Sequence, residues 1–167
     1  MKFRKAEEKD LNAIMNIINQ AQNYFKEQGI DQWQNGYPNR QTIRNDIENG
    51  NSYVLLKDEI VVGTVAIIPG VEKSYESIYN GEWKSNGEYI TIHRIAIDPR
   101  YKRLGFATMI LDKAEELCKS KGISSIRIDT HEENLPMQNL LQKNNYEYCG
   151  IIYLEDRSKR LAFEKVL

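Results

Sequence analysis

Residues 94–108 read RIAIDPRYKRLGFAT and contain the most informative pattern in the chain. This stretch begins inside a largely apolar run over residues 89–97, which predicts a central strand covered on both faces. Asp98 and Pro99 end that strand, and a helical pattern of apolar residues follows over residues 105–121. A strand is therefore expected to lead through a short basic turn into the N-terminus of a long helix.

This turn has the chemistry of an anion site. A helix N-terminus presents backbone N–H groups and a partial positive charge, and both favour a bound phosphate. Gly105 and Ala107 are small enough to let a ligand approach the backbone, while Lys102 and Arg103 add positive charge. The same residues also fit a basic surface turn in which glycine only permits tight packing. The phosphate loops G-x-x-x-x-G-K-(S/T) and G-x-G-x-x-G do not occur in the chain.

Composition limits the class of protein. With 167 residues, 41% of them hydrophobic, the chain is expected to form one domain over residues 1–167. A net charge of −1 gives no global reason to expect nucleic acid or an anionic membrane as a partner. No apolar signal core or membrane-spanning run of about 20 residues is visible, so we expect a cytoplasmic protein. Cys118 and Cys149 have no metal-ligand or redox spacing and are expected to be small buried hydrophobes.

Hydrophobic periodicity predicts the remaining elements. The expected strands cover residues 2–6, 52–57, 60–68, 89–97, 124–130, 146–153 and 159–166, and the expected helices cover residues 11–29, 41–48, 105–121 and 136–144. Residues 70–87, rich in Gly, Ser, Asn and Tyr, indicate a long surface connection. This order predicts an α/β (α+β) chain, with one mixed, mostly antiparallel sheet of about 6 to 7 strands and about 4 helices on both of its faces.

The turn also carries a family resemblance. Residues 102–107, KRLGFA, resemble the (Q/R)-x-x-G-x-(G/A) signature of the GNAT superfamily of acyl-CoA-dependent N-acyltransferases, with lysine at the first position. Residues 95–99 are similar to the family's preceding strand, and residues 134–146 resemble its N-x-x-A-x-x-L-Y-x-K-x-G-F element. The resemblance implies the GNAT fold. It also implies an N-acetyltransferase that moves the acetyl group of acetyl-CoA, its co-substrate, to a primary amine of a small molecule or peptide by direct attack.

The resemblance further implies where acetyl-CoA binds. In the family, the central strand splays from its neighbour, here near Ile95, and the pantetheine arm lies between the two strands. Backbone amides of the turn and the helix start would hold the pyrophosphate. Asn134 would contact the pantetheine or order the next helix, although asparagine before Pro136 is also an ordinary helix cap. The implied cofactor-binding residues are Ile95, Ala96, Ile97, Lys102, Arg103, Leu104, Gly105, Phe106, Ala107, Thr108 and Asn134.

Acetyl transfer to an amine calls for a base. An alkylammonium has a pKa near 10, so only about one molecule in 10³ is neutral at pH 7. Regular strand alternation places Thr91, His93, Ile95 and Ile97 on one face, which favours His93 as the base because the expected thioester-polarising N–H lies two residues later. Members of the family that place histidine here use it through water. His131 is a second candidate, and a structural role is the alternative for both.

The family's usual general acid is missing, because Leu141 occupies the position of its tyrosine. Tyr153 or Tyr146 replaces it from the next strand, or a thiolate with a pKa near 8.5 leaves without help. Core packing is the alternative for each tyrosine. Leu141 also keeps open a second function, a non-catalytic acyl-CoA-binding sensor or scaffold module.

The family's acceptor amine enters opposite the CoA, between the N-terminal helices and later loops. The aromatic residues in segments that suit this place are Trp33, Tyr37, Tyr75, Tyr79 and Trp83. They would favour a peptide or a hydrophobic amine, or they pack in the core. Glu132 or Glu133 would attract a cation. A monomer and a homodimer both fit the sequence.

Overall fold

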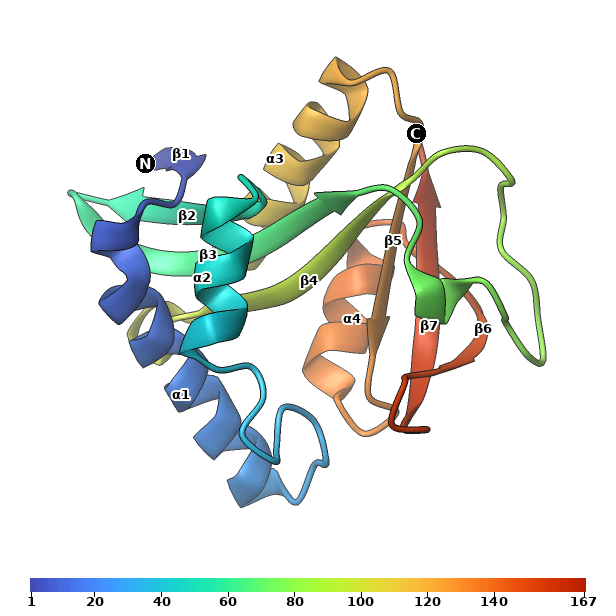
Figure 1. Cartoon of the computed structure of the whole chain (residues 1–167), viewed down its shortest axis with the longest axis horizontal. Helices are drawn as coiled ribbons and strands as arrows, with labels where there is room; N and C mark the ends of the chain where they lie inside the picture. Colours follow the sequence, from blue (N-terminus) through green and yellow to red (C-terminus); the bar gives the residue numbers. More distant parts are fainter. The chain divides into compact units, whose positions relative to one another are not determined.

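The computed structural model describes residues 1–167 and contains the elements in the predicted order (Figure 1). The strands are β1 (Lys2–Lys5), β2 (Ser52–Lys57), β3 (Ile60–Pro69), β4 (Ile90–Ile97), β5 (Ser125–Thr130), β6 (Glu147–Tyr153) and β7 (Lys159–Val166). The helices are α1 (Leu11–Gln28), α2 (Arg40–Glu48), α3 (Phe106–Ser120) and α4 (Leu135–Lys143), with short 3-10 turns η1 (Glu8–Asp10), η2 (Lys73–Tyr75) and η3 (Pro99–Tyr101). None of the helices is both long and apolar enough to span a bilayer.

The strands form one mixed sheet, in the order β1-β2-β3-β4-β5-β7-β6. The pairs β1–β2, β2–β3, β5–β7 and β6–β7 are antiparallel, whereas β4 and β5 are parallel. The predicted fold class is therefore confirmed. The parallel pairing joins Ile90 to Ile126 and Thr91 to Arg127, near the start of β4.

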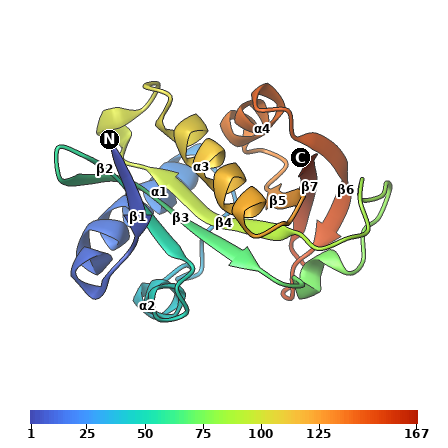
Figure 2. The same ribbon diagram turned by 90° about the horizontal axis from the view of Figure 1, so that it is seen from above.

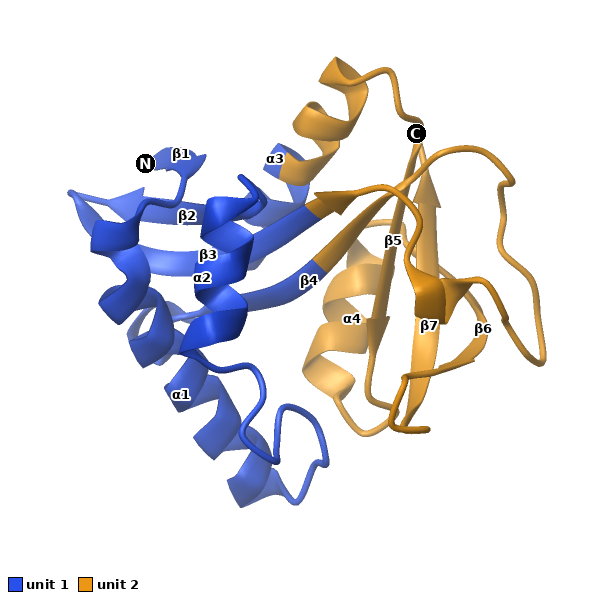
Figure 3. Cartoon of the chain, viewed as in Figure 1, with its two compact units in different colours: residues 1–67, 93–113 blue, residues 68–92, 114–167 orange.

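The chain forms two compact units, drawn in separate colours in Figure 3. The first unit contains residues 1–67 and 93–113, and the second contains residues 68–92 and 114–167. Three elements, β3, β4 and α3, run from one unit into the other. The single domain predicted for residues 1–167 stays a prediction.

In the first unit, α1 and α2 lie on one side of the strands and the start of α3 lies on the other (Figure 2). The apolar stripe of α1, including Ile14 and Ile18, packs with Ile43 of α2 and Val54 of β2. Each such fully buried side chain contributes about 1.5–3 kcal/mol. On the other side, Gly63 of β3 is closely packed: a Cβ there would lie 2.8 Å from Ile97 Cδ1 and 3.0 Å from Ile110 Cδ1, so these side-chain ends would have to shift.

In the second unit, the connection over residues 70–87 is more than a surface loop, so that prediction is wrong in part. Tyr75 is 2% exposed and packs with Tyr89 and Ile152. The Trp83 indole Nε1–H donates to the Tyr75 carbonyl at 2.9 Å. Aromatic side chains in an otherwise polar stretch gain free energy by burial, and they fold this segment onto the sheet.

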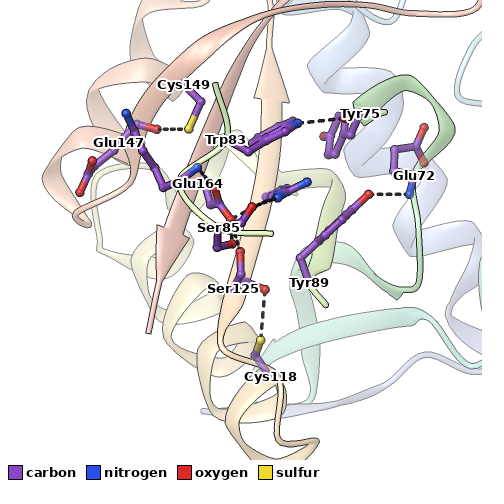
Figure 4. A network of polar contacts seen from close by, with 12 residues as sticks. Glu72, Tyr75, Trp83, Ser85, Tyr89, Cys118, Ser125, Glu147, Cys149 and Glu164 are labelled. Carbon is purple, nitrogen blue, oxygen red and sulfur yellow. Dashed lines mark hydrogen bonds and ion pairs between the residues drawn. The ribbon is translucent and has the colours of Figure 1, made fainter. Parts of the chain in front are cut away.

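A buried ion pair fastens the same segment to the strands (Figure 4). Arg127 of β5 and Glu164 of β7 pair at 3.2 Å, and their side chains are only 6% and 0% exposed. Arg127 Nη2 also donates to the Ser85 carbonyl at 2.7 Å. Its guanidinium carbon lies 4.2 Å from the Trp83 ring centroid and 4.1 Å from that of Tyr89. Arg127 therefore joins the sheet to the C-terminal part of the connecting segment.

Glu164 collects several hydrogen bonds at the centre of this network. Its carboxylate accepts from the Ser125 hydroxyl and the Lys84 N–H, each at 2.5 Å, and from the Ser85 hydroxyl. Burial opposes the charged form, but the hydrogen bonds from Ser125, Ser85 and Lys84, with the charge of Arg127, outweigh it and lower the pKa of Glu164.

This network predicts an acid-dependent loss of stability. A carboxyl whose pKa is lowered in the folded protein stabilises it fully above the unfolded value, and that contribution is lost as pH falls through the folded value. Glu164→Gln should lower the free energy of unfolding by about 3–5 kcal/mol near pH 7, because Arg127 is left buried and unpaired. The difference from the parent should shrink below pH 4.5, the ordinary value for this carboxyl.

Urea unfolding across pH measures this difference. Glu132→Gln is the control, because its carboxylate is 49% exposed and pairs with the exposed Lys159, so little loss is expected. A Glu164→Gln loss as small as the control's, or one that stays constant into acid, contradicts the assignment.

Candidate active site

The turn between β4 and α3 is built around Asp98, which is 4% exposed. Its carboxylate accepts from the Arg100 backbone N–H at 3.0 Å and from Arg100 Nη2 at 2.8 Å. The hydrogen bond from the Arg100 side chain is the main reason that the pKa of Asp98 is lowered. The Asp98 N–H donates to the Val62 carbonyl at 2.9 Å, so β3 fixes the point at which β4 ends.

The approach to α3 has two residues with left-handed backbone, Arg103 at φ +64° and Gly105 at φ +80°. Glycine adopts this conformation without the cost that an L side chain pays, which gives Gly105 a backbone reason for its identity. A Cβ at Gly105 would meet no atom within 4 Å, so the space beside it is open. The left-handed backbone favours glycine at this position. The predicted close approach of a ligand to the backbone would also need a small residue here.

The first turn of α3 begins directly after this turn. Its first helical hydrogen bond runs from the Met109 N–H to the Gly105 carbonyl at 3.0 Å. Helix geometry gives the N–H groups before Met109 no carbonyl within the helix, and it places the positive end of the helix dipole at Phe106 and Ala107. These features are compatible with a bound anion, and the anion site itself stays a prediction.

The other residues of the turn divide into exposed and buried groups. Lys102 Nζ lies 4.4 Å from the ring centroid of Tyr24 on α1, which holds its charge at the turn. Arg103 is exposed and Leu104 is 56% exposed. Phe106, in contrast, is buried and stacks against Tyr101, with ring centroids 6.2 Å apart. The side chain of Phe106 therefore packs in the core, and only its backbone N–H is a candidate donor to an anion.

The backbone of β4 departs from a regular strand at Arg94, where φ is +52°. Ala96 packs in the α1 and α2 cluster, whereas Ile97 Cδ1 lies against Gly63 beside α3. A left-handed residue inside a strand acts as a bulge and shifts the period of side-chain directions. The positive φ of Arg94 lies between His93 and Ile95, and their predicted common face stays a prediction. The parallel pairs also end at Thr91, well before the splay predicted near Ile95.

A cluster that the sequence reasoning missed surrounds this bulge. Arg94 Nε and Nη2 donate to the two carboxylate oxygens of Asp46 on α2, each at 2.7 Å, and Nη1 donates to the Tyr37 hydroxyl at 2.8 Å. Burial opposes the charge on Arg94, but its bonds to Asp46 and Tyr37 raise its pKa above the ordinary value. No sequence signal joins Arg94 to an aspartate so far away in the chain.

The two histidines lie in different units and have different surroundings. His93 lies half-buried on β4 beside the Arg94 bulge. His131 follows β5 in the second unit, and its Nδ1 accepts from the Glu133 N–H at 3.0 Å. The structural role considered as the alternative to catalysis for His131 is therefore present, as a hydrogen bond within a turn.

The second unit contains the other predicted site residues. Asn134 is 4% exposed and caps α4, because its side-chain oxygen accepts from the Met137 N–H at 3.3 Å. Leu141 is fully buried, and Tyr146 is 4% exposed. Tyr153 is 46% exposed, with its ring edge-on to Tyr79 at 5.5 Å. Of the two tyrosines considered as acids, Tyr153 is the one with solvent access.

The aromatic residues considered for the acceptor site are divided between the two units. Trp33 packs edge-on against Phe25, and Tyr75 and Trp83 belong to the core of the second unit. Tyr37 and Tyr79 are 47% and 51% exposed, in the first and second unit respectively. Glu132 is paired with Lys159 at 2.9 Å.

Comparisons with known proteins place this geometry in a family. A profile of the Acetyltransferase (GNAT) family matches residues 14–146. The chain is 24% identical over 159 residues to YesJ, an uncharacterised N-acetyltransferase of Bacillus subtilis strain 168, covering 93% of this chain and 84% of that protein.

Solved structures agree with that match. The crystal structure of a GNAT-family acetyltransferase from Streptococcus agalactiae 2603 superposes with a TM-score of 0.90 and 37% identity, covering 99% of this chain and 95% of that one. A complex of the PaiA N-acetyltransferase of Thermoplasma acidophilum with coenzyme A shares the fold, with a TM-score of 0.72, 17% identity and coverage of 99% and 98%. The profile match and these relatives show that this chain belongs to the GNAT acetyltransferase family.

Proposed function

We propose that this protein is an amine N-acetyltransferase that takes the acetyl group from acetyl-CoA. The observation that carries the proposal is the start of α3, where left-handed Arg103 and Gly105 lead into the helix beside open space. The coenzyme A complex of the PaiA protein supports the choice of ligand. Acetyl-CoA supplies a thioester whose acetyl group is transferred to the acceptor.

The residues of the turn fit a pyrophosphate. Backbone N–H groups over residues 103–108 would donate to its oxygens, and the positive helix end adds charge stabilisation. Lys102 and Arg103 would screen the remaining negative charge. A side chain at Gly105 would occupy the space that the oxygens need, which makes Gly105 the most sensitive position of the turn.

The second half of β4 would hold the pantetheine arm and polarise the thioester. Backbone groups of Ile95 and Ile97 are the proposed partners of the arm, with Ala96 between them. The Ile95 N–H is the proposed donor to the thioester oxygen, where negative charge develops during attack. A rigid backbone donor of this kind needs no reorganisation when the reaction occurs.

The proposed proton acceptor is His93. An acceptor amine must lose a proton before it attacks, and an imidazole near the reacting centre can take it directly or through one water. The half-buried position of His93, beside the bulge that precedes Ile95, supports this role. Tyr153 is the proposed acid for the departing thiol, supported by its exposure. Asn134, which caps α4 through its side-chain oxygen, would contact the pantetheine or order that helix.

A second candidate function follows from Leu141. A fully buried leucine stands where the family has its tyrosine acid, which favours a protein that binds acetyl-CoA without transferring the acetyl group. Turnover separates the two functions. The protein with acetyl-CoA and a panel of aliphatic, aromatic and peptide amines should release free thiol in proportion to amine. Saturable binding of acetyl-CoA without amine-dependent thiol release supports the sensor instead.

Gly105→Glu should abolish acetyl-CoA binding. Ligand at about a hundred times its dissociation constant stabilises a protein by roughly 2.7 kcal/mol, so the parent's melting temperature should rise and the variant's should not. Gly122→Glu is the matched control, since Gly122 has φ +70° and open space but follows the opposite end of α3. Equal shifts for the parent and Gly105→Glu would remove the turn as the phosphate site.

His93→Ala should lower kcat/KM by about 10²–10⁴-fold and remove the acidic limb of its pH profile, because that limb reports protonation of the base. His131→Ala is the control and should behave like the parent. A His93→Ala profile with the parent's shape would exclude His93 as the base.

A further inference from the structure

The backbone of Arg94 is the strained point of β4. Its φ of +52° is in the left-handed region, which non-glycine residues seldom occupy, and here it falls inside a strand. Residues hold such conformations only where surrounding contacts determine them strongly. The cause of the strain should therefore be found in what the Arg94 side chain contacts.

Those contacts form a closed cluster. Arg94 and Asp46 face each other with two hydrogen bonds of 2.7 Å, and both side chains are only 11% exposed. A planar guanidinium paired twice with a carboxylate fixes direction as well as distance. The third bond, of 2.8 Å, reaches the hydroxyl of Tyr37 in the connection between α1 and α2.

The far side of the cluster is held as well. Gln22 Nε2 on α1 donates to the carbonyls of Tyr37 and Pro38, at 2.9 and 3.0 Å. Asp46 lies within α2, and Ile43 one turn before it is 3% exposed in the core. The anchor of Arg94 is therefore a packed helix and a tethered connection, which gives it the stiffness needed to hold a strained backbone.

The backbone dihedrals of Arg94 also set the direction of the next peptide group, because that peptide turns with its ψ angle. The N–H of this peptide belongs to Ile95. If Arg94 relaxed to ordinary extended geometry, the Ile95 N–H would turn away from its present direction. The side-chain cluster and the direction of that N–H are thus mechanically linked.

We propose that Arg94 is a positioning residue for acetyl transfer: paired with Asp46, it holds the left-handed turn of β4 and so aims the Ile95 N–H. The proposal rests on the function proposed above, in which that N–H polarises the thioester. It assigns Arg94 no contact with substrate.

Substitution to alanine and to glycine separates this role from simple ion-pair stability. Both remove the side chain, but glycine accepts positive φ whereas alanine in the left-handed region is disfavoured by a factor of about ten. Arg94→Ala should therefore lower kcat by roughly tenfold or more, and Arg94→Gly should recover much of that loss. The KM for acetyl-CoA should change far less than kcat. Equal kcat values for the two variants would overturn the proposal.

Each variant is also made with Asp46→Asn, so that no buried carboxylate is left unpaired and folding is preserved. Tyr37→Phe removes only the third bond and should keep kcat within about twofold. A Tyr37→Phe loss as large as that of Arg94→Ala would move the role from the ion pair to the hydroxyl and refute the proposal.

Arg4→Ala is the matched control for lost stability. Arg4 pairs with the buried Asp10 through two bonds of 2.7 and 3.0 Å in the same unit, away from the β4 turn. This variant should melt earlier than the parent but keep its kcat. If Arg4→Ala lowers kcat as much as Arg94→Ala does, lost stability explains both and the proposal fails.

A readout without turnover keeps this inference separate from the proposed function. In the ligand-free protein, the amide NMR signal of Ile95 should move in Arg94→Ala and return toward the parent position in Arg94→Gly. An Ile95 signal unmoved in Arg94→Ala overturns the positioning role. A parent protein without turnover contradicts the function instead.

Discussion

The backbone N–H groups at the start of a helix have no carbonyl partners within the helix, and the function proposed for this protein depends on where those groups lie. In this protein such N–H groups lie at the start of α3. That helix follows β4 and the turn in which the Asp98 carboxylate accepts from the Arg100 N–H. β3 fixes the turn through Val62, and Tyr24 of α1 holds Lys102 beside it. The core of the first unit thus places a positive helix end at one defined point of the strand.

Three residues near the start of α3 have positive φ: Arg94, Arg103 and Gly105. Gly105 and Arg94 hold this conformation for different reasons. Gly105 needs no support, because it has no side chain to clash. Arg94 is held by a buried ion pair whose partner belongs to a helix in the same core. Strain held in this way is typical of sites where backbone groups must point in one direction.

The second unit shows the opposite use of a buried ion pair. Arg127 and Glu164 lie on regular strands, and their bonds fasten the connecting segment over the sheet (Figure 4). The Ser85 and Ser125 hydroxyls donate to the same Glu164 oxygen as Arg127, and the Lys84 N–H donates to the other oxygen. This network determines structure, since it satisfies its own polar groups and binds the segment to the strands.

The sequence was sufficient for the elements and their order, because apolar periodicity in α1 and α3 and the β-branched runs of β2 and β3 are strong local signals. It also located the turn at Gly105. It did not reveal the bulge at Arg94, because a left-handed arginine depends on Asp46, a contact between distant residues rather than a local pattern. For the same reason, the sequence left open whether Tyr75 lines the acceptor site or packs in the core, since its burial depends on Tyr89 and Ile152.

If acetyl-CoA binds the backbone of β4 and of the α3 start, it should protect the amides there from solvent. Amide hydrogen exchange, resolved by NMR with and without saturating acetyl-CoA, measures this protection. We expect slowed exchange concentrated at the amides of residues 95–97 and 103–108. Slowed exchange elsewhere with these amides unchanged, or no change at all, would contradict this binding site.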